Sequence, residues 1–382
     1  MNTAPNTTPN TTPNTTTIET VVIGAGQAGL CTGYHLQKRG RSFVILDAGS
    51  RVGDQWRQQW DSLKLYSPTR YDSLPGLRFP GERWSFPGKD QVADYLEQYA
   101  ARFQLPIRFR ARVERLESDG DGGFVVTTNE GEYRCRNVVV CTGTFGRTPN
   151  VPAFAGELDP SVLQLHSSEY RRSGQLRDGS VLVVGASHSG TDIAYEVALT
   201  HRTILAGRDC GQIPPRIESR KMRALFPVIV FAWRHLVTRR TPVGRKLMNE
   251  VRLHGGPMLR VKRSDLADRG VERITERVAG TEDGKPVIDG TAYDVANVVW
   301  ATGFRQVFDW IKLPVIGDDG WPVEYRGVVR DAPGLFFCGL CFQFGFGSMV
   351  LPGVGRDAGY VAERIAERSP RTERTTRVAA AA

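Results

Sequence analysis

Two stretches of this chain share one pattern, in which an apolar run leads into a glycine-rich loop and then into a helix-forming segment. The first is TVVIGAGQAGLCTGYHL (Thr20–Leu36) and the second is SVLVVGASHSGTDIAYEV (Ser180–Val197). In a parallel sheet, such a strand–loop–helix unit directs backbone N–H groups and the positive end of the helix dipole at a pyrophosphate. The pair predicts an α/β chain with two dinucleotide-binding (Rossmann-like) domains.

The first unit has every part of the dinucleotide fingerprint. Gly24 suits the tight turn, Gly26 lets the backbone approach the pyrophosphate, and Gly29 allows the helix to pack closely on the strand. The next apolar run, SFVILD, ends in Asp47, 18 residues after Gly29. Because a carboxylate at this position accepts hydrogen bonds from a ribose diol, the first unit predicts an FAD site.

The second unit departs from the first at two positions. Ser187 stands between Gly185 and Gly190, where the first unit has its middle glycine, and the following run, RTILAG, leads to Arg208 instead of an acid. A guanidinium binds a 2′-phosphate through charge-assisted hydrogen bonds, whereas a carboxylate repels it, so this unit predicts an NADPH site. The competing esterase motif, Gly-x-Ser-x-Gly, requires glycine at the position of Ser189 and is disfavoured.

Two further apolar runs end in a Thr-Gly pair, at Thr142–Gly143 and Thr302–Gly303. Small residues at a strand end let the backbone lie close to a flat ligand. We expect these pairs to mark the crossings into an inserted second domain and back. The expected division is an FAD-binding domain at 18–155 and 304–370, an NADPH-binding domain at 156–303 with a basic and apolar insertion around 211–263, and disordered tails at 1–17, which is built of Asn-Thr-Thr-Pro repeats, and at 371–382.

The positive charge of the chain is concentrated in one region. The net charge is +9, and residues 201–263 alone carry 15 Lys/Arg against 3 Asp/Glu. No helix-turn-helix, RNA-binding signature or zinc-finger spacing accompanies these cations, so they indicate a surface near an anionic cofactor and no nucleic-acid partner. No apolar stretch approaches the ~20 residues of a membrane span. Six scattered cysteines and the lack of a signal pattern lead us to expect a cytoplasmic protein.

One segment of the insertion is both apolar and basic. In RKMRALFPVIVFAWRHLVTRR (residues 220–240), a ten-residue apolar run is flanked by cations. The run is too short to span a bilayer. We expect it to cover an apolar substrate cavity, and peripheral contact with an anionic membrane surface is the alternative.

The order of the motifs GAGQAG, VGDQW, LKLYSP, CTGTF, HSSEY, GASHSG and WATGF resembles the flavin-containing monooxygenase superfamily, in particular its bacterial and YUCCA-type members. The resemblance covers about residues 18–368. It implies FAD in the first domain and NADPH in the second, with a small organic molecule and O2 as the other partners. In the family pattern, the FAD-binding positions correspond to Gly24, Gly26, Gly29, Asp47, Gln55, Trp56, Val113, Thr142 and Gly143. The NADPH-binding positions correspond to Gly185, Ser187, His188, Ser189, Gly190, Arg208 and Gly303.

The resemblance also implies a reaction. NADPH delivers a hydride to the flavin, the reduced flavin forms a C4a-peroxy adduct with O2, and the bound nicotinamide shields that adduct until a substrate takes one oxygen atom. The cofactors carry this chemistry while the protein orients them and excludes water, so no catalytic triad or acid–base pair is expected. The expected function is a monooxygenase acting on a small, apolar molecule. The alternatives are an FAD-containing NADPH reductase or oxidase and a non-catalytic dinucleotide-binding sensor.

Several residues depart from the family pattern. Tyr66 falls where many animal-type members have an asparagine near the flavin, which puts the stability of the oxygenated flavin in question, and His188 replaces another common asparagine. The Baeyer–Villiger signature Phe-x-Gly-x₃-His-x₃-Trp is only echoed. Nine residues separate Gly156 from His166, and Tyr170 stands at the last position. Ester-forming oxygenation is therefore disfavoured.

Two cysteine patterns invite other chemistry. Cys338-Gly-Leu-Cys341 has the spacing of a redox dithiol, but its place in the apolar run LFFCGL favours packing within a sheet. Cys31 and His35 share one face of the first helix. Since no third ligand accompanies them, no metal site is expected.

Overall fold

The computed structural model describes residues 15–143 and 148–368, apart from the side chain of Leu253. Of the tails expected at 1–17 and 371–382, residues 1–14 and 371–382 lie outside this range. The expected tail is wrong at its inner end, because Thr15, Thr16 and Thr17 begin strand β1 (Thr15–Ile23) and pair in parallel with β6 (Gly131–Val140). Threonine is a good strand former, and here its backbone finds a partner strand even though the side chains are exposed.

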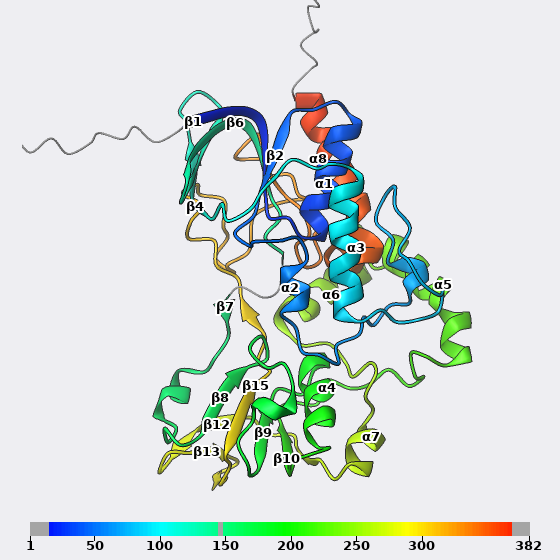
Figure 1. Ribbon diagram of the computed structural model, residues 1–382, viewed down its shortest axis with the longest axis vertical. Helices are drawn as coiled ribbons and strands as arrows, with labels where there is room; N and C mark the ends of the chain where they lie inside the picture. Colours follow the sequence, from blue (N-terminus) through cyan, green and yellow to red (C-terminus); the bar gives the residue numbers. More distant parts are fainter. Residues whose placement is uncertain (1–14, 144–147, 369–382) are drawn as a thin grey trace, which may run out of the picture.

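The first domain is built on a sheet of order β3-β2-β1-β6-β5-β4, with β17 also pairing with β6 (Figure 1). The pairs among β1, β2, β3, β6 and β17 are parallel, whereas β4 and β5 form an antiparallel arm. The further strands are β2 (Phe43–Leu46), β3 (Ile107–Arg108), β4 (Val113–Ser118), β5 (Phe124–Thr128) and β17 (Leu335–Phe337).

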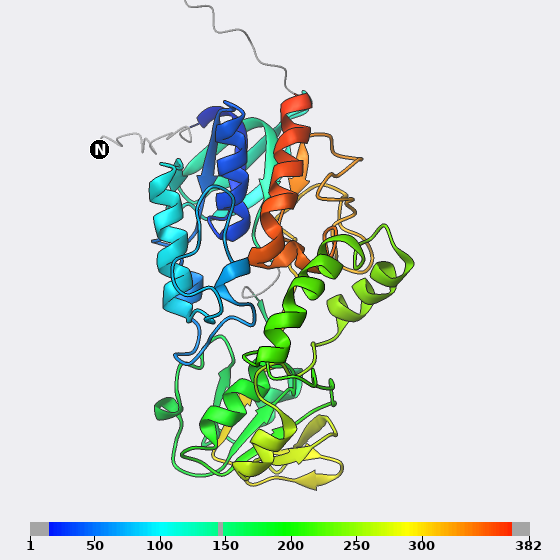
Figure 2. The same ribbon diagram turned by 90° about the vertical axis from the view of Figure 1, so that its right-hand side faces the viewer.

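Helices cover one face of this sheet, and irregular chain covers the other. The helices are α1 (Gln27–Lys38), α3 (Lys89–Arg102) and α8 (Leu351–Arg368), which lie side by side in both views (Figures 1 and 2). Val22 of β1 packs in the helix-side core, while its neighbours Val21 and Ile23 pack in the core of the opposite face. Burial on both faces explains why the sequence reads as a continuous apolar run and does not alternate.

The second domain has a fully parallel sheet of order β11-β10-β9-β15-β8. Its strands are β8 (Leu163–His166), β9 (Val181–Val184), β10 (Thr203–Ala206), β11 (Glu272–Ile274) and β15 (Asn297–Trp300). One face carries α4 (His188–Val197) and α7 (Arg263–Asp268). The other is covered by a small antiparallel sheet of β12 (Val278–Glu282), β13 (Lys285–Ile288) and β14 (Thr291–Ala292).

Two short strands join the domains. β7 (Thr148–Pro149) and β16 (Phe304–Arg305) pair antiparallel between the two sheets (Figure 1). One carries the chain out of the first domain and the other returns it, just after each Thr-Gly pair. The fold class is therefore as expected: α/β, with the second Rossmann-like domain inserted in the first. The remaining short helices are α2 (Asp54–Arg57), η1 (Thr69–Tyr71), η2 (Ala153–Glu157), η3 (Ser173–Gln175) and η4 (Phe346–Met349).

The insertion forms two helices, α5 (Arg220–His235) and α6 (Pro242–Leu253), which pack on the first domain although they interrupt the second (Figure 2). Arg239 donates to the buried carboxylate of Glu324 at 2.5 Å, and Arg252 Nε donates to the carbonyl of Cys341 at 3.1 Å. Within the described ranges, no helix is both long and apolar enough to cross a membrane.

Candidate functional site

The two glycine loops have matching geometry. Each lies at the carboxyl end of a central strand, β1 or β9, and opens a helix, α1 or α4. Gly24 and Gly185 have φ of +106° and +109°, a region that favours glycine. A Cβ on Gly24 would lie 2.7 Å from the carbonyl oxygen of Cys141, and a Cβ on Gly185 would clash with that of Ala301. Since these two residues directly precede the Thr-Gly pairs, each pair lies beside a glycine loop.

The remaining glycines divide into packing and open positions. A Cβ on Gly29 would run into the carbonyl oxygen of Gly24, and one on Gly190 would run into that of Gly185. Gly26 differs, because nothing lies within 4 Å of its Cβ position. A backbone position that faces open space beside a helix N-terminus fits the approach of a pyrophosphate.

Asp47 and Val113 lie at the same end of the first sheet. The two carboxylate oxygens of Asp47 accept hydrogen bonds from the backbone N–H groups of Ala25 and Gly49, at 2.6 and 2.7 Å. The N–H of Ala111, just before β4, donates to the carbonyl of Asp47 at 3.0 Å, which places the start of β4 here. These hydrogen bonds hold the loop in place. Each carboxylate oxygen can still accept a second hydrogen bond, and the expected contact with a ribose stays a prediction.

Gln55 and Trp56 belong to the short helix α2. Trp56 is half-buried and packs against the cores of both domains. Gln55 is exposed, and its carbonyl accepts from the side chain of Gln59 at 3.0 Å. The structure thus places Trp56 at the domain junction.

In the second loop, Ser187 and His188 are covered by a segment that the sequence analysis missed. Ser187 Oγ donates to the carbonyl of Gly256 at 2.9 Å, and a Cβ on Gly256 would lie 2.7 Å from the His188 ring. The Gly255-Gly256 pair was the sequence signal for this segment, because only glycine can lie so close to Ser187 and His188. Burial lowers the pKa of His188 to about 4, and its buried Nε2 has no partner in the described part of the chain. Nε2 faces the Gly256 position and is covered by the protein, so contact between the neutral His188 ring and a coenzyme stays a prediction.

Gly303 and Ser189 are the two remaining predicted NADPH-binding positions. Ser189 is half-buried in the first turn of α4. The carbonyl of Gly303 accepts from the N–H of Asn150 at 2.9 Å and lies 3.0 Å from His166 Nε2. His166 is buried and anchors the crossing, which agrees with a structural role.

Arg208 lies two residues beyond β10 and is exposed, as a phosphate-binding cation must be. The hydrogen bond from Arg263 lowers the pKa of the adjacent Asp209, so this carboxylate is ionised, and the guanidinium of Arg263 at 2.5 Å offsets its charge. Arg273 donates to the carbonyls of Leu205 at 3.0 Å and of Gly207, which fixes the end of β10. Sequence reasoning found Arg208 but not Arg263 or Arg273. The only signal for Arg263 was the basic composition of residues 201–263, and Arg273 lies outside that region.

Tyr66 lies beside the second loop, against the other domain. Its hydroxyl donates to Asp192 Oδ2 at 2.9 Å, and its ring centroid is 5.2 Å from that of His188. Burial and the nearby Asp192 raise the pKa of Tyr66, so the hydroxyl stays protonated and donates. The guanidinium carbon of Arg260 lies 5.6 Å from the Tyr66 ring centroid. The family position pointed to Tyr66, but no local pattern pointed to Asp192.

We expect the stability of an Asp192→Asn variant to exceed that of the parent increasingly as pH rises. Burial raises the pKa of Asp192 to about 6. Its contribution to stability is therefore fully present below the unfolded pKa of about 4 and is lost as pH rises through about 6. Asparagine has no charge to desolvate, so the difference in unfolding free energy should grow by about 2–3 kcal/mol between about pH 4 and about pH 8. Urea unfolding of the parent and the variant at both pH values measures this difference. The charged groups around Asp192, which are Glu196, Glu218 and Arg260, are the same in both proteins.

An Asp119→Asn variant is the control for this titration. Hydrogen bonds from the backbone N–H groups of Asp121 and Gly123 lower the pKa of Asp119, so its substitution should change stability with the opposite sign. A stability difference for Asp192→Asn that does not vary with pH would contradict the expected titration.

The cysteines lie in packed surroundings. Cys338 packs in the helix-side core with Cys31 and Cys141, whereas Cys341 packs on the opposite face of the sheet. A hydrogen bond with Cys141 and burial raise the pKa of Cys338, and burial raises that of Cys341 to about 11. Both stay thiols at neutral pH, which favours packing over dithiol chemistry. In the described part of the chain, no group of three or more His, Cys, Asp or Glu is placed to hold a metal ion.

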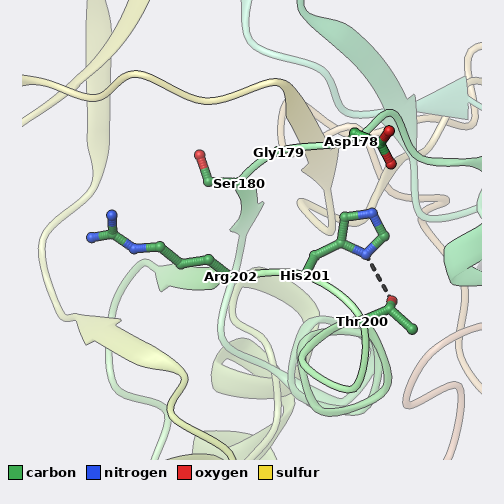
Figure 3. A pocket seen from close by; sticks show the side chains of 6 residues that line it. All are labelled: Asp178, Gly179, Ser180, Thr200, His201 and Arg202. Carbon is green, nitrogen blue, oxygen red and sulfur yellow. Dashed lines mark hydrogen bonds between the residues drawn. The ribbon is translucent and has the colours of Figure 1, made fainter.

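A surface hollow of about 570 Å³ lies away from both loops (Figure 3). It is lined by residues 178–180 and 200–202, at the amino ends of β9 and β10, where His201 hydrogen-bonds Thr200 at 2.7 Å. Ligands of doubly wound sheets bind at the carboxyl ends of the strands. This hollow is therefore not part of the candidate site.

The fold and the two loops define a two-domain dinucleotide-binding oxidoreductase. The family model described as pyridine nucleotide-disulphide oxidoreductase matches residues 21–222. An uncharacterized oxidoreductase, CzcO, of Bacillus subtilis (strain 168) is 35% identical over 91% of this chain and 99% of its own length. The chain belongs to the pyridine nucleotide-disulphide oxidoreductase family.

Two further relatives carry the word monooxygenase. The indole-3-pyruvate monooxygenase YUCCA6 of Arabidopsis thaliana is 27% identical over 90% of this chain and 89% of its own. The solved structure of a flavin-containing monooxygenase from Stenotrophomonas maltophilia has a TM-score of 0.73 and 26% identity, covering 92% of this chain and 99% of that one. The resemblance to the flavin-containing monooxygenase superfamily is confirmed, and the chain is an FAD- and NADPH-dependent oxidoreductase.

Proposed function

We propose that the protein is a monooxygenase that inserts one oxygen atom from O2 into a small, apolar organic molecule. The observation that carries the proposal is the pair of equivalent glycine loops, each at the carboxyl end of parallel strands, with Trp56 packed between the two domains. This arrangement suits two nucleotides that exchange a hydride directly. The Arabidopsis and Stenotrophomonas relatives support oxygenation as the fate of those electrons.

We assign the first loop to FAD and the second to NADPH. The open Gly26 and the N-terminus of α1 would receive the FAD pyrophosphate, with Asp47 accepting from the ribose and Thr142–Gly143 beside the loop. The N-terminus of α4 would receive the NADPH pyrophosphate, with Arg208 on the 2′-phosphate. When bound, the flavin accepts the hydride and activates O2, while the protein orients the two nucleotides and excludes water.

The inner face of α5 supports an apolar substrate. Met222, Phe226 and Val230 are buried there, and the Phe226 ring stacks on Tyr71 with centroids 5.6 Å apart. Trp233 contacts Phe346 of η4 at 4.8 Å between ring centroids. η4 ends at Met349, whose carbonyl accepts from Gln27 of α1 at 2.8 Å. The apolar face of α5 thus extends toward the FAD loop, as a cover over a substrate cavity would.

The outer face of α5 has the side chains that peripheral contact with a membrane surface would require. Leu225, Val228 and Phe231 are 43%, 60% and 56% exposed, and Arg220, Arg223 and Arg234 are exposed beside them. Apolar and basic side chains together favour an anionic lipid surface. Flotation with anionic vesicles at low salt tests the contact, and protein that stays at the bottom of the gradient would exclude it.

Isotopically labelled O2 tests the proposed function. We expect products of thioethers, amines, ketones or 2-oxo acids to gain one labelled oxygen atom by mass spectrometry when NADPH is consumed. Recovery of all consumed O2 as hydrogen peroxide with every substrate would support the oxidase alternative. Flavin that NADPH does not reduce would support the dinucleotide sensor.

A further inference from the structure

A segment of the first domain lies directly on the helix that opens the second loop. Residues 60–66 follow α2 and reach α4 (Figure 1). Trp60 and Leu63 are buried in the same apolar cluster as Ile193 and Val197 of α4. The N–H of Asp61 also donates to the carbonyl of Arg171, in the second domain, at 2.8 Å. The two domains are therefore joined along α4 as well as at their crossing strands.

The polar part of this junction consists of two carboxylates on α4. Asp192 and Glu196 are one helical turn apart, so they lie on the same side of the helix. Tyr66 donates to Asp192 at 2.9 Å, and Ser62 donates to Glu196. Each hydroxyl comes from the first domain and each carboxylate from the second. Arg260 strengthens the same contact by donating to the carbonyl of Leu65 at 2.7 Å.

We propose that Tyr66 and Asp192 are positioning residues for hydride transfer, because their hydrogen bond fixes α4 and the loop at its N-terminus against the FAD domain. The inference depends on the assignment of the two loops to FAD and NADPH. α4 is a rigid ten-residue helix whose first residues, His188–Gly190, belong to the loop, so a shift at Asp192 moves the loop with it. Hydride transfer requires the reacting atoms in near-contact, and a misplacement of about 1 Å costs on the order of a hundredfold in rate.

The chain offers a matched control for this hydrogen bond. Tyr170 also donates to a carboxylate of α4, to Glu196 at 2.7 Å, and its ring is fully buried. Both Tyr170 and Glu196 belong to the second domain, so this bond does not cross the junction. Removing either hydroxyl leaves one acidic side chain of the same helix without a tyrosine donor, but only the Tyr66 variant loses a hydrogen bond between the two domains.

The experiment is anaerobic stopped-flow reduction of the FAD-loaded protein by NADPH. We expect Tyr66→Phe to lower the limiting rate of flavin reduction by about tenfold to a hundredfold, with a much smaller change in the NADPH dissociation constant. Tyr170→Phe should reduce its flavin at the parental rate. Equal rates for the parent and Tyr66→Phe, or an equal loss in both variants, would overturn the proposal.

A second pair of variants keeps the test independent of folding. Asp192→Asn retains an oxygen acceptor for Tyr66 and should keep a rate close to that of the parent, whereas Asp192→Ala should lose rate as Tyr66→Phe does. Parental rates in Asp192→Ala would contradict positioning by this bond. The assay follows only the reductive step, so failure of oxygen insertion with labelled O2 leaves this result unaffected.

Discussion

A Gly26→Ala variant is expected to fold like the parent and to bind FAD about tenfold to a hundredfold more weakly, a loss of about 1–3 kcal/mol from an overpacked contact. Gly26 has φ of −76°, which alanine adopts without strain, and no protein atom lies within 4 Å of its Cβ position. The added methyl group therefore meets nothing in the protein itself. It would occupy the space through which the backbone approaches the pyrophosphate. Fluorescence titration of the flavin-free protein with FAD measures the loss.

Two other glycines separate this effect from a general loss of structure. Gly29→Ala would push a Cβ into the carbonyl oxygen of Gly24 and should lower the melting temperature as well as FAD binding. Gly156→Ala adds a methyl group at another open position, outside the loops, and should leave both unchanged. If Gly26→Ala bound FAD as tightly as the parent, the pyrophosphate would not lie at this loop.

An Arg208→Ala variant is expected to weaken NADPH binding by about 1.5–3 kcal/mol, or about tenfold to a hundredfold, and NADH binding much less. Only NADPH carries the 2′-phosphate. Asp209 beside Arg208 is already paired with Arg263, so the guanidinium of Arg208 is left to face a phosphate. Dissociation constants for both coenzymes, from the dependence of flavin reduction on their concentration, measure the difference.

Arg216→Ala is the control for this prediction. Arg216 is an exposed arginine of the same domain, but it is paired with Asp265 through two hydrogen bonds. The Arg216→Ala substitution should weaken the binding of NADPH and of NADH to the same small extent. If Arg208→Ala weakened NADH as much as NADPH, the 2′-phosphate would lie elsewhere.

Local patterns were sufficient to predict the two glycine loops and the inserted second domain. The turn at Gly24, the helix contact at Gly29 and their counterparts at Gly185 and Gly190 depend on residues within one strand–loop–helix unit. The crossings after Thr142–Gly143 and Thr302–Gly303 follow because strand ends in a parallel sheet meet at one edge. In each case, the chemistry of a few neighbouring residues determines the local geometry.

The contacts between distant segments could not be predicted in the same way. Asp192 sits in an ordinary helical stretch, and only the fold brings Tyr66 to it from 126 residues away. The pairing of Arg239 with Glu324, which holds the insertion against the first domain, joins residues 85 positions apart. In the sequence, Arg263 is one of many cations in a basic region. Its ion pair with Asp209, which offsets a negative charge beside Arg208, is visible only in the structure.

Anaerobic titration of the purified, FAD-loaded protein with NADPH tests most directly whether the two loops hold nucleotides that exchange a hydride. We expect the yellow flavin absorbance to disappear at one equivalent of NADPH per FAD. Flavin absorbance that stays unchanged in excess NADPH, in a protein that retains its FAD, would contradict direct hydride transfer between the two loops.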